Sequence, residues 1–426
     1  MRLQKYDSYK DSGVEWLGEI PSEWEVKSLK YILSFTTGGT PSSHISGYYD
    51  GNEPWVTIAD IDGKYINKTH FISKNGAKNA NMILSPKGSL LYSFKLSVGQ
   101  VAFTSSDVYT NEAIISIHPH KNLNLNFWYY LLPIFVIKNA NTNIYGAFLL
   151  NQDLIKNSTL LFPPFQEQQK IALFLDTKTQ QLDKAIKQKE KLIKLLKERK
   201  QIVINEAVTK GLDKTVTMKD SGVEWLGEIP KHWEVNKLKY IFNEINKRSE
   251  TGEEELLSLS KYKGVIPKSS LDERAGMAKT LIGYKKVYYN NLVINKMQAV
   301  NGLLAVSKIE GITSPDYSVY KVKSNQYNID YYGLLLNQSI YLSEFKKVVT
   351  GVMEGFIRLY TDDLYNIIVQ VPPKQEQKQI VNFIENQTSK IDNAIDLQQK
   401  QIDKLKEYKT SLIDSIVTGK VRVYDE

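Results

Sequence analysis

The chain has 426 residues, which is long enough for two or more domains with separate hydrophobic cores. It contains no cysteine, so disulfides and thiolate metal sites are excluded and a reducing compartment is favoured. The formal net charge of +8 favours a polyanionic partner but does not name one. The N-terminus lacks a signal-peptide core and no apolar run reaches membrane-spanning length, so we predict a cytoplasmic protein.

The chain is a tandem duplication. Residues 11–21 read DSGVEWLGEIP, and residues 220–230 repeat the same letters 209 residues later. Shorter matches follow: Trp24-Glu25-Val26 recurs as Trp233-Glu234-Val235, and Leu29-Lys30-Tyr31-Ile32 recurs as Leu238-Lys239-Tyr240-Ile241. We call residues 11–32 and 220–241 the two leaders. We predict that their tryptophans are packing anchors, namely Trp16, Trp24, Trp225 and Trp233.

Each leader precedes a region that the other half does not repeat. These regions are the first variable domain, residues 36–160, and the second variable domain, residues 243–369. Short apolar runs between turn residues predict strands of a mixed α/β domain in both. The apolar segment Asn126–Lys138 predicts a helix, and the stretch SEWEVKSLKYILSF at 22–35 predicts another short one. A repeated scaffold that carries two different variable domains is typical of a protein that recognises two different targets.

A long helix follows each variable domain. The turn Phe162-Pro163-Pro164-Phe165-Gln166-Glu167-Gln168 recurs as Val371-Pro372-Pro373-Lys374-Gln375-Glu376-Gln377, and a proline pair followed by Gln-Glu favours a helix start. Helices should run from these turns to about Val208 and Val417, and end at Gly211 and Gly419. Their apolar spacing predicts a coiled-coil seam. The seam residues are Ile171, Leu175, Leu182, Ala185, Leu192, Leu196 and Val203 in one helix, and Ile380, Ile384, Ile391, Ala394, Leu405 and Leu412 in the other.

Polar residues interrupt both seams at equivalent positions, where Lys178 corresponds to Gln387 and Lys189 to Gln398. Two interpretations stay open: solvated side chains without a special role, or residues that set register or face a partner. We expect a duplicated helix to pair with its own copy in the antiparallel sense.

Together these segments predict an α+β fold, in which two mixed α/β domains are joined by two long antiparallel coiled-coil helices in a pseudo-two-fold internal repeat. The predicted boundaries are 1–162 for the first leader and variable domain, 163–211 for the first spacer helix, 212–371 for the second leader and variable domain, and 372–426 for the second spacer helix and the C-terminal tail.

Signatures of catalysis are weak. The loop of amino-methyltransferases needs Asn or Asp before its two prolines to orient the target amine, but Phe162 and Val371 stand there. Gly38-Gly39-Thr40 lacks the lysine of a phosphate-binding loop, and Pro315-Asp316 lacks the partners of a nuclease site. The pair His118-x-His120 is the one histidine spacing that suits a metal, and it is more typical of a solvated strand end. The sequence therefore argues against an enzyme that acts alone.

Both variable domains carry polar side chains that suit DNA contacts, since Arg and Lys bind guanine edges and phosphates while Asn and Gln bind adenine. Any one of them alone is more readily explained as an ordinary solvated residue, but the set is more persuasive because it occurs on two different domains of a basic chain. The candidates in the first variable domain are Thr40, Ser42, Lys95, Thr110, Asn111 and Tyr145. Those in the second are Lys247, Lys261, Lys263, Arg274, Lys296, Gln298, Asn301 and Arg358.

The doubled leader, the Pro-Pro-x-Gln-Glu-Gln turn before a long helix, and the helix ends Val208-Thr209-Lys210-Gly211 and Val417-Thr418-Gly419 resemble the specificity subunit of type I restriction-modification systems over the whole chain. Within the resemblance, Gly39-Thr40-Pro41-Ser42, Trp55 and Asp60 look like the opening of a target-recognition domain, and Gly355 with Arg358 looks like its closing loop. The second domain has Asn246-Lys247-Arg248 instead of Gly39-Thr40-Pro41, so different half-sites are expected.

The resemblance implies two target-recognition domains that each read one half of a bipartite site in double-stranded DNA, with the helices as the spacer. It also implies two methyltransferase (modification) subunits and two restriction (translocase-nuclease) subunits as partners. No cofactor is then expected in this chain, because S-adenosylmethionine, ATP and Mg²⁺ belong to the partners. Two other functions are kept as alternatives: an enzyme that modifies DNA by itself, and a coiled-coil scaffold that binds no nucleic acid.

Overall fold

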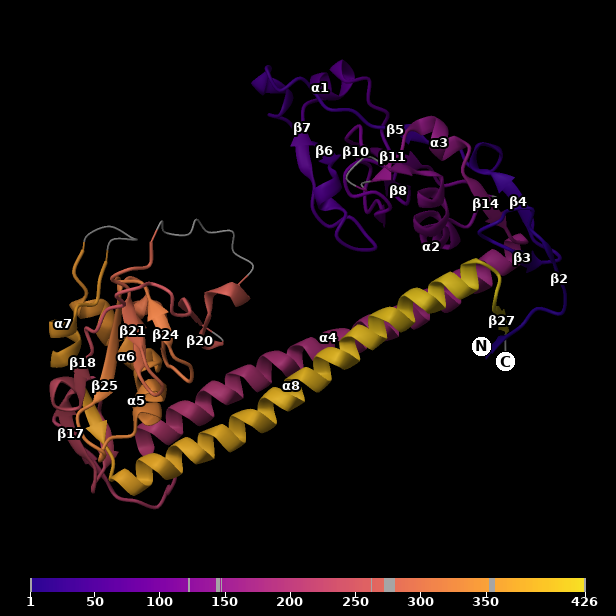
Figure 1. The fold of residues 1–426 in the computed structure, drawn as a ribbon. Helices are drawn as coiled ribbons and strands as arrows, with labels where there is room; N and C mark the ends of the chain where they lie inside the picture. The colour runs from indigo at the N-terminus through magenta and orange to yellow at the C-terminus, as the bar shows by residue number, and fades with distance from the viewer. Residues whose placement is uncertain are drawn as a thin grey trace. The chain divides into compact units, whose positions relative to one another are not determined.

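The computed structural model describes residues 2–121, 123–142, 146, 148–261, 263–271, 280–351 and 357–424. The chain forms two compact units, one made of Met1–Lys189 with Lys400–Glu426 and the other of Glu190–Gln399. Each unit contains one leader, one variable domain and a part of both long helices, which are labelled α4 (Phe165–Lys210) and α8 (Lys374–Val417) in Figure 1.

The first unit holds the elements up to α4 and the C-terminal strand. Its strands are β1 (Arg2–Gln4), β2 (Tyr9–Asp11), β3 (Glu19–Pro21), β4 (Glu25–Ser28), β5 (Thr36–Thr37), β6 (Glu53–Val56), β7 (His70–Ile72), β8 (Leu90–Ser93), β9 (Val101–Phe103), β10 (Tyr109–Thr110), β11 (Ile114–Ile117), β12 (Asn141–Thr142), β13 (Phe148–Leu149), β14 (Thr159–Phe162) and β27 (Arg422–Tyr424). Its helices before α4 are α1 (Lys74–Asn79), α2 (Leu125–Phe135) and α3 (Gln152–Lys156).

The second unit repeats this plan with other loops. Its strands are β15 (Met218–Asp220), β16 (Glu228–Pro230), β17 (Glu234–Lys237), β18 (Phe242–Glu244), β19 (Leu257–Ser260), β20 (Gly264–Pro267), β21 (Lys285–Val287), β22 (Leu292–Asn295), β23 (Leu304–Val306), β24 (Gly311–Thr313), β25 (Tyr317–Val322) and β26 (Ile368–Val371). Its helices before α8 are α5 (Ile329–Leu336), α6 (Ser339–Val348) and α7 (Thr361–Asn366).

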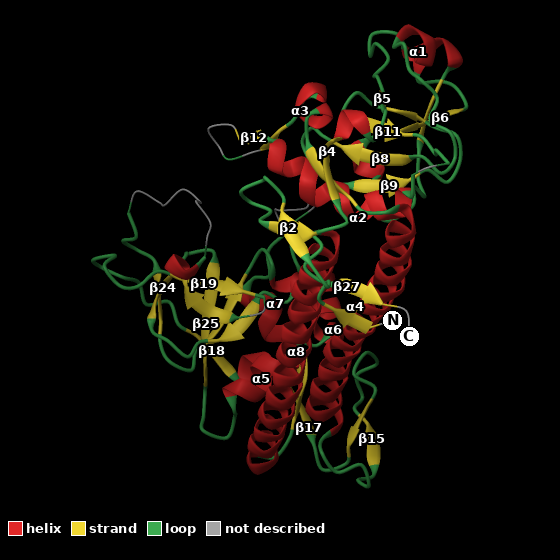
Figure 2. Ribbon diagram, turned by 90° about the vertical axis from the view of Figure 1, so that its right-hand side faces the viewer, coloured by secondary structure: helices red, strands yellow, loops and turns green. Residues whose placement is uncertain are grey.

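The two variable domains have the same central sheet although their sequences share little. The first sheet has the strand order β5-β11-β8-β9 and the second has the order β18-β25-β22-β23. A helix that begins at an asparagine cap follows each sheet, since Asn124 accepts from the backbone N–H of Asn126 and Asn328 accepts from that of Asp330. Figure 2 shows the first of these helices, α2, against the sheet that contains β8 and β9.

The predicted short helix at 22–35 is wrong in its first half. Residues Glu25–Ser28 form β4, and only Leu29–Tyr31 form a turn of 3₁₀ helix. The reason is tertiary: β4 pairs antiparallel with β14, the strand that leads into the proline turn. The second leader behaves identically, because β17 pairs with β26. Pairing of segments more than a hundred residues apart outweighs the local helical preference.

Both long helices begin at the proline turn and end near the predicted glycines. The Pro164 carbonyl accepts from the N–H groups of Glu167 and Gln168 at the start of α4. Gly211 and Gly419 follow the two helices with φ of +78° and +76°, a conformation that glycine adopts without strain. The side-chain amides of Gln168 and Gln377 each donate back to the first proline carbonyl, at 2.9 and 2.8 Å.

The helices pair in the antiparallel sense within each unit. In the first unit the Lys409 ammonium lies 2.7 Å from the Asp183 carboxylate, and in the second the Lys200 ammonium lies 2.7 Å from the Asp392 carboxylate. The repeat exchanges these two ion pairs, because Asp183 corresponds to Asp392 and Lys200 to Lys409. The register between the helices is therefore the same in both units.

The predicted seam needs two corrections. Leu192 is exposed, whereas the buried isoleucines Ile186, Ile204 and Ile402 were not predicted. In a heptad repeat, successive seam positions are separated alternately by three and four residues. One wrong spacing therefore shifts the following predicted positions away from the buried face of the helix. Lys178 is also exposed and off the seam, while Lys189 is half-buried on it and donates to the Gln401 side chain.

Two of the four leader tryptophans are core anchors, as predicted. Trp24 and Trp233 are fully buried, and each indole N–H donates to the glutamate in the first turn of a long helix: Trp24 to Glu167 at 2.8 Å and Trp233 to Glu376 at 3.0 Å. Each therefore joins its leader to the start of a helix. The prediction is wrong for Trp16, which stays 42% exposed, while Trp225 is half-buried.

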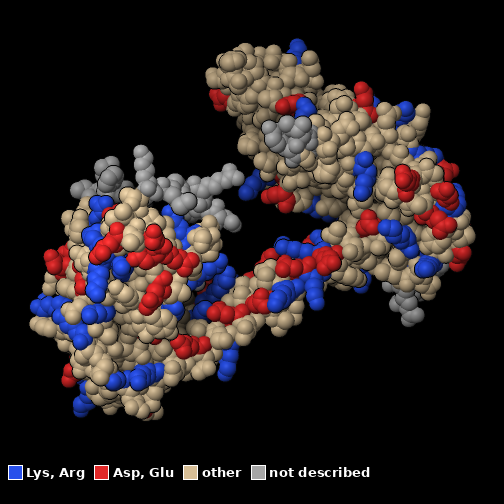
Figure 3. Space-filling model, viewed as in Figure 1, with Lys and Arg blue, Asp and Glu red and all other residues tan. Residues whose placement is uncertain are grey.

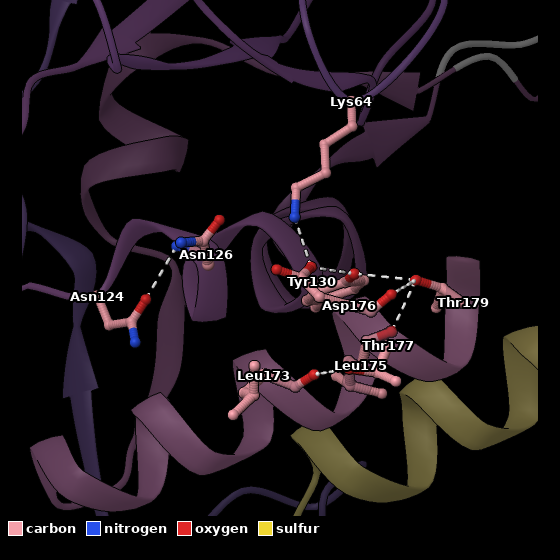
Figure 4. A network of polar contacts seen from close by, with 9 residues as sticks. All are labelled: Lys64, Asn124, Asn126, Tyr130, Leu173, Leu175, Asp176, Thr177 and Thr179. Carbon is pink, nitrogen blue, oxygen red and sulfur yellow. Dashed lines mark hydrogen bonds and ion pairs between the residues drawn. The ribbon is translucent and has the colours of Figure 1, made fainter. Parts of the chain in front are cut away.

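A polar network fixes the first variable domain to α4. The Asp176 carboxylate on α4 accepts from the Lys64 ammonium and, at 2.6 Å, from the Tyr130 hydroxyl, which also contacts Thr179 at 3.1 Å (Figure 4). The second domain is attached by uncharged groups, because Tyr331 and Gln370 both donate to the Val208 carbonyl of α4.

Candidate nucleic-acid interface

In the first variable domain, three loops meet where the central sheet ends: the segment after β5, the β8–β9 turn and the β10–β11 turn. The Gly39 N–H donates to the Thr110 carbonyl at 2.9 Å, and the Phe94 N–H donates to the Ala113 carbonyl at 2.9 Å. Glycine is required at position 38, because a Cβ there would lie 1.8 Å from the Thr110 carbonyl oxygen. These contacts bring four predicted residues to one edge, namely Thr40, Lys95, Thr110 and Asn111.

Glu112 is the centre of this edge and was missed by sequence reasoning. Its carboxylate accepts a hydrogen bond from the Thr40 hydroxyl. That bond and, to a smaller extent, the charge of Lys95 lower the pKa of Glu112 below its ordinary value. An ionised carboxylate accepts from the amino group of cytosine, which makes Glu112 a candidate for base contact. A single glutamate in a turn has no distinguishing sequence signal.

The other predicted residues of this domain differ in the exposure and the contacts of their side chains. The Thr110 side chain is only 1% exposed, and a buried side chain cannot reach a base, so Thr110 supports the loop from inside. Asn111 is half-buried and its side chain accepts from the Ala113 N–H at 3.2 Å, which holds the turn. Ser42 is half-buried in the segment after Thr40. Tyr145 lies outside the described residues.

The β8–β9 turn also presents an apolar side chain that was not predicted. Leu96 is 93% exposed and adopts a φ of +59°, next to the exposed Lys95. The turn is held from below, because the Ser93 hydroxyl accepts from the Gln100 N–H at 3.0 Å. Apolar side chains beside lysines are used by DNA-bending proteins to separate base steps.

In the second variable domain, charged groups gather beside the equivalent β22–β23 turn. The Glu244 carboxylate accepts from the buried Lys285 ammonium at 3.0 Å and from the Thr361 hydroxyl at 2.8 Å. Burial alone would raise the pKa of Glu244, but these two hydrogen bonds and the charges of Lys285 and Lys296 together outweigh it, and the net pKa is lowered. Burial and then the nearby Lys285 lower the pKa of the half-buried Lys296.

Arg358 belongs to the same group of charges. Its guanidinium lies 3.6 Å from the Asp316 carboxylate, and the Lys296 carbonyl accepts from the neighbouring Leu359 N–H at 3.0 Å. The structure therefore brings together Lys296 and Arg358, which are 62 positions apart in the numbering of the chain. A cavity of about 680 Å³ opens beside Lys296. It is lined by Asn243, Glu244, Lys296, Lys321, Tyr360, Thr361, Asp362 and Tyr365.

The remaining predicted residues of the second domain lie on other turns or pair with each other. Gln298 and Asn301 share a turn, where the Asn301 amide donates to the Gln298 side chain at 2.7 Å. Lys261 and Lys263 are exposed at the β19–β20 turn, and Lys247 is exposed after β18. Arg274 and Gly355 lie outside the described residues.

On the face drawn in Figure 3, acidic and basic side chains are interspersed over the second variable domain and along the paired helices, and no single basic patch stands out. Among the residues that the structure describes, no group of three or more potential ligands is arranged to hold a metal ion. Within the same residues, no helix is both long and apolar enough to cross a membrane.

Comparisons with known proteins agree with this architecture. The family model for the type I restriction modification DNA specificity domain matches residues 21–195 and again 230–407. The MjaIX specificity subunit of Methanocaldococcus jannaschii is 25% identical, with 96% of this chain and 95% of that protein covered. The EcoBI specificity subunit of Escherichia coli is 29% identical over 55% of this chain and 49% of that protein.

Solved structures show the same fold at low sequence identity. A chain from work on complex assembly and conformational transition of the type I R-M system superposes with a TM-score of 0.68 at 12% identity, covering 93% of this chain and 98% of that one. The HsdS subunit from Thermoanaerobacter tengcongensis gives a TM-score of 0.52 at 13% identity, with coverage of 94% and 98%. The chain belongs to the family of type I restriction-modification DNA specificity subunits.

Proposed function

We propose that the chain reads a split DNA site, with one half recognised by each variable domain and the paired helices setting the gap between the halves. The observation that carries this proposal is the contrast between a repeated scaffold and two different sets of loops on the same sheet. The residues around Glu112 and the residues around Lys296 and Arg358 are the proposed readers. Because the two variable domains carry different side chains on their loops, they recognise two different half-sites.

The proposed partners follow from family membership. Two methyltransferase subunits and, through them, two restriction subunits assemble on the chain, and double-stranded DNA lies along both variable domains. The chain is non-catalytic by itself in this proposal. S-adenosylmethionine, ATP and Mg²⁺ are bound by the partner subunits.

The test is a footprint of the chain together with its methyltransferase subunit on a random DNA library. We expect one asymmetric sequence with two protected halves and a gap of fixed length. Because phosphates supply much of the affinity, binding should weaken steeply as salt rises. Protection of a single half would contradict the two-reader proposal, and methylome sequencing of a host that expresses the complex would name the bases.

A stand-alone DNA-modifying enzyme is the competing function. It is disfavoured by Phe162 and Val371, which occupy the positions where an amine-orienting Asn or Asp would stand. The isolated chain should transfer no methyl group from labelled S-adenosylmethionine to DNA, and transfer at a rate near that of the complex would reverse this conclusion.

A further inference from the structure

The segment after β5 in the first variable domain is fixed on both sides of Thr40. The Trp55 indole N–H donates to the Gly39 carbonyl at 3.2 Å, and the Tyr49 hydroxyl donates to the Pro41 carbonyl at 2.6 Å. Thr40 lies between these two anchored residues and its side chain is exposed. Side chains that recognise a ligand are best placed on backbone that is held in this way.

The β10–β11 turn that carries Glu112 is fixed as well. The Asn111 N–H donates to the Val56 carbonyl at 3.0 Å, and the Asn111 side chain accepts from the Ala113 N–H at 3.2 Å. The Ala113 carbonyl accepts from the Phe94 N–H at 2.9 Å, which joins this turn to the β8–β9 turn. Both neighbours of Glu112 are therefore held, while its own side chain is exposed.

The Glu112 carboxylate is oriented by the Thr40 hydroxyl, which donates to it across the two loops. That hydrogen bond is the main reason why the pKa of Glu112 lies below its ordinary value, and the charge of Lys95 contributes to the same lowering. An ionised carboxylate is repelled by DNA phosphates. Its presence at a DNA-binding edge therefore needs a compensating hydrogen bond from a donor on the DNA.

The corresponding position in the second variable domain has a different role. Thr40 corresponds to Ser249 in the 209-residue repeat, but Ser249 is only 2% exposed and its hydroxyl donates to the Glu254 carboxylate. The Lys286 ammonium lies 3.0 Å from the Glu254 carboxylate and neutralises it. This second pair is thus satisfied within the chain, whereas the first pair is exposed at the sheet edge.

A C·G base pair matches the chemistry of the first edge. In the major groove, cytosine presents its N4 amino group as a donor, and the paired guanine presents the O6 and N7 acceptors. In an A·T pair, the amino donor of adenine adjoins the N7 acceptor, whose lone pair repels a carboxylate. Glu112 as the acceptor and Lys95 as the donor fit the C·G pair on both of its bases.

We propose that Glu112 reads a cytosine in the half-site of the first variable domain, with its carboxylate accepting from the N4 amino group. Lys95 donates to the O6 and N7 acceptors of the paired guanine. Thr40 is a positioning residue, because it orients the carboxylate. This inference rests on the proposed function, which places DNA against this edge.

The test measures the base preference of the full-length chain with its methyltransferase subunit, on libraries randomised in one half-site at a time. The unaltered complex should require cytosine at one position of the first half-site. Glu112→Gln keeps an oxygen that accepts from Thr40, but its amide matches the N6 and N7 groups of adenine. Preference at that position should therefore move to adenine, with at least about a fivefold loss for cytosine. The side chain is exposed, so that thermal melting should not change.

A second measurement separates direct contact from a positioning role of Glu112. N4-methylcytosine at that position replaces the hydrogen that faces the major groove with a methyl group. It should weaken binding of the unaltered complex by at least about fivefold. Thr40→Val should lower the preference for cytosine in part, and Thr40→Ser should restore it because the hydroxyl is kept. If N4-methylation has no effect, Glu112 does not contact the base and the inference is overturned.

The matched control removes one negative charge from another turn of the same domain. Asp107 is exposed and accepts from the Lys87 N–H at 2.8 Å, and Asp107→Asn keeps an acceptor for this bond. It should leave the base preference at every position unchanged. If it shifts the preference at the same position as Glu112→Gln does, net charge sets that preference and the inference is overturned.

The outcomes separate this inference from the proposed function. A complex that protects no split site contradicts both. A complex that protects its split site but keeps every base preference in Glu112→Gln contradicts the reading of cytosine alone. Lys296→Ala identifies the half-site of the second domain, and a change of preference in that half-site by Glu112→Gln would also overturn the inference.

Discussion

The first variable domain pairs β5, β11, β8 and β9 in the order in which the second pairs β18, β25, β22 and β23, but the turns at the edge of these sheets carry different chemistry. The first edge is built on the Thr40–Glu112 hydrogen bond with Lys95 and Leu96 beside it. The second is built on Glu244, which accepts from Lys285, and on Lys296, which lines a cavity and lies next to the segment that carries Arg358. The central sheet and the long helices are therefore the same in both halves. The turns at the sheet edge differ, and we expect these turns to set which DNA half-site each domain recognises.

The largest effect should come from breaking one platform and leaving the other intact. In Gly38→Ala the new Cβ would lie 1.8 Å from the Thr110 carbonyl, and in Gly311→Ala it would lie 2.3 Å from the Glu255 carbonyl. Each change should destabilise its own domain by about 3 kcal/mol, because backbone cannot move aside. Hydrogen exchange should localise the loss to one domain. Gly63→Ala has no atom within 4 Å and should stay within about 0.5 kcal/mol of the unaltered chain.

Removing one reader should relax only one half of the DNA site. Lys95 and Lys296 occupy the equivalent turns β8–β9 and β22–β23, so Lys95→Ala should weaken binding to the first half-site and Lys296→Ala to the second. The expected cost is about 1–3 kcal/mol for a direct base contact and less for a phosphate contact. Binding to libraries randomised in one half at a time measures this. Equal losses in both halves would show that the two edges do not read separate halves.

Acid should loosen the contacts that Glu244 makes in the second variable domain. Burial raises the pKa of Glu244, but hydrogen bonds from Thr361 and Lys285 and the charges of Lys285 and Lys296 together keep it below its ordinary value of 4.5. A lowered folded-state pKa contributes stability that is present above the unfolded pKa and is lost as pH falls through the folded pKa. Stability of the second domain should therefore fall below about pH 4.5. Glu244→Gln should remove this dependence, which domain-resolved exchange between pH 3 and 7 would detect; an unchanged profile would contradict the assignment.

The smallest effect concerns the scaffold, where the two units should respond alike. Asp183→Asn and Asp392→Asn each remove one interhelical ion pair whose partners are partly exposed. Each should cost about 0.2–1 kcal/mol, and the two costs should be equal within error, because the repeat exchanges the two pairs. Urea unfolding at low and high salt measures this. A large difference between the two variants would show that the two ion pairs do not contribute equally to stability, although their geometry is the same.

Much of the architecture could be predicted from the sequence because it depends on local or repeated patterns. The proline turns and Gly211 and Gly419 mark the ends of the long helices through backbone restrictions that operate within a few residues. The 209-residue repeat identified the two equivalent halves directly. The predicted site residues Lys296 and Arg358 lie on segments joined by the hydrogen bond from the Leu359 N–H to the Lys296 carbonyl, although their proximity had no local signal.

Other features were decided by contacts between distant segments. Residues 25–28 form a strand because β14 lies beside them, and Thr110 is buried because Gly38 allows the backbone to approach. The roles of Glu112 and Glu244 depend on hydrogen bonds from residues 72 and 117 positions away. The repeat, the ends of the long helices and the family resemblance could be recognised from the sequence alone, because they depend on residue types at fixed spacings. Only the tertiary structure decided which polar side chains share an edge and which leader residues stay exposed, because burial and hydrogen bonding are properties of the packed chain.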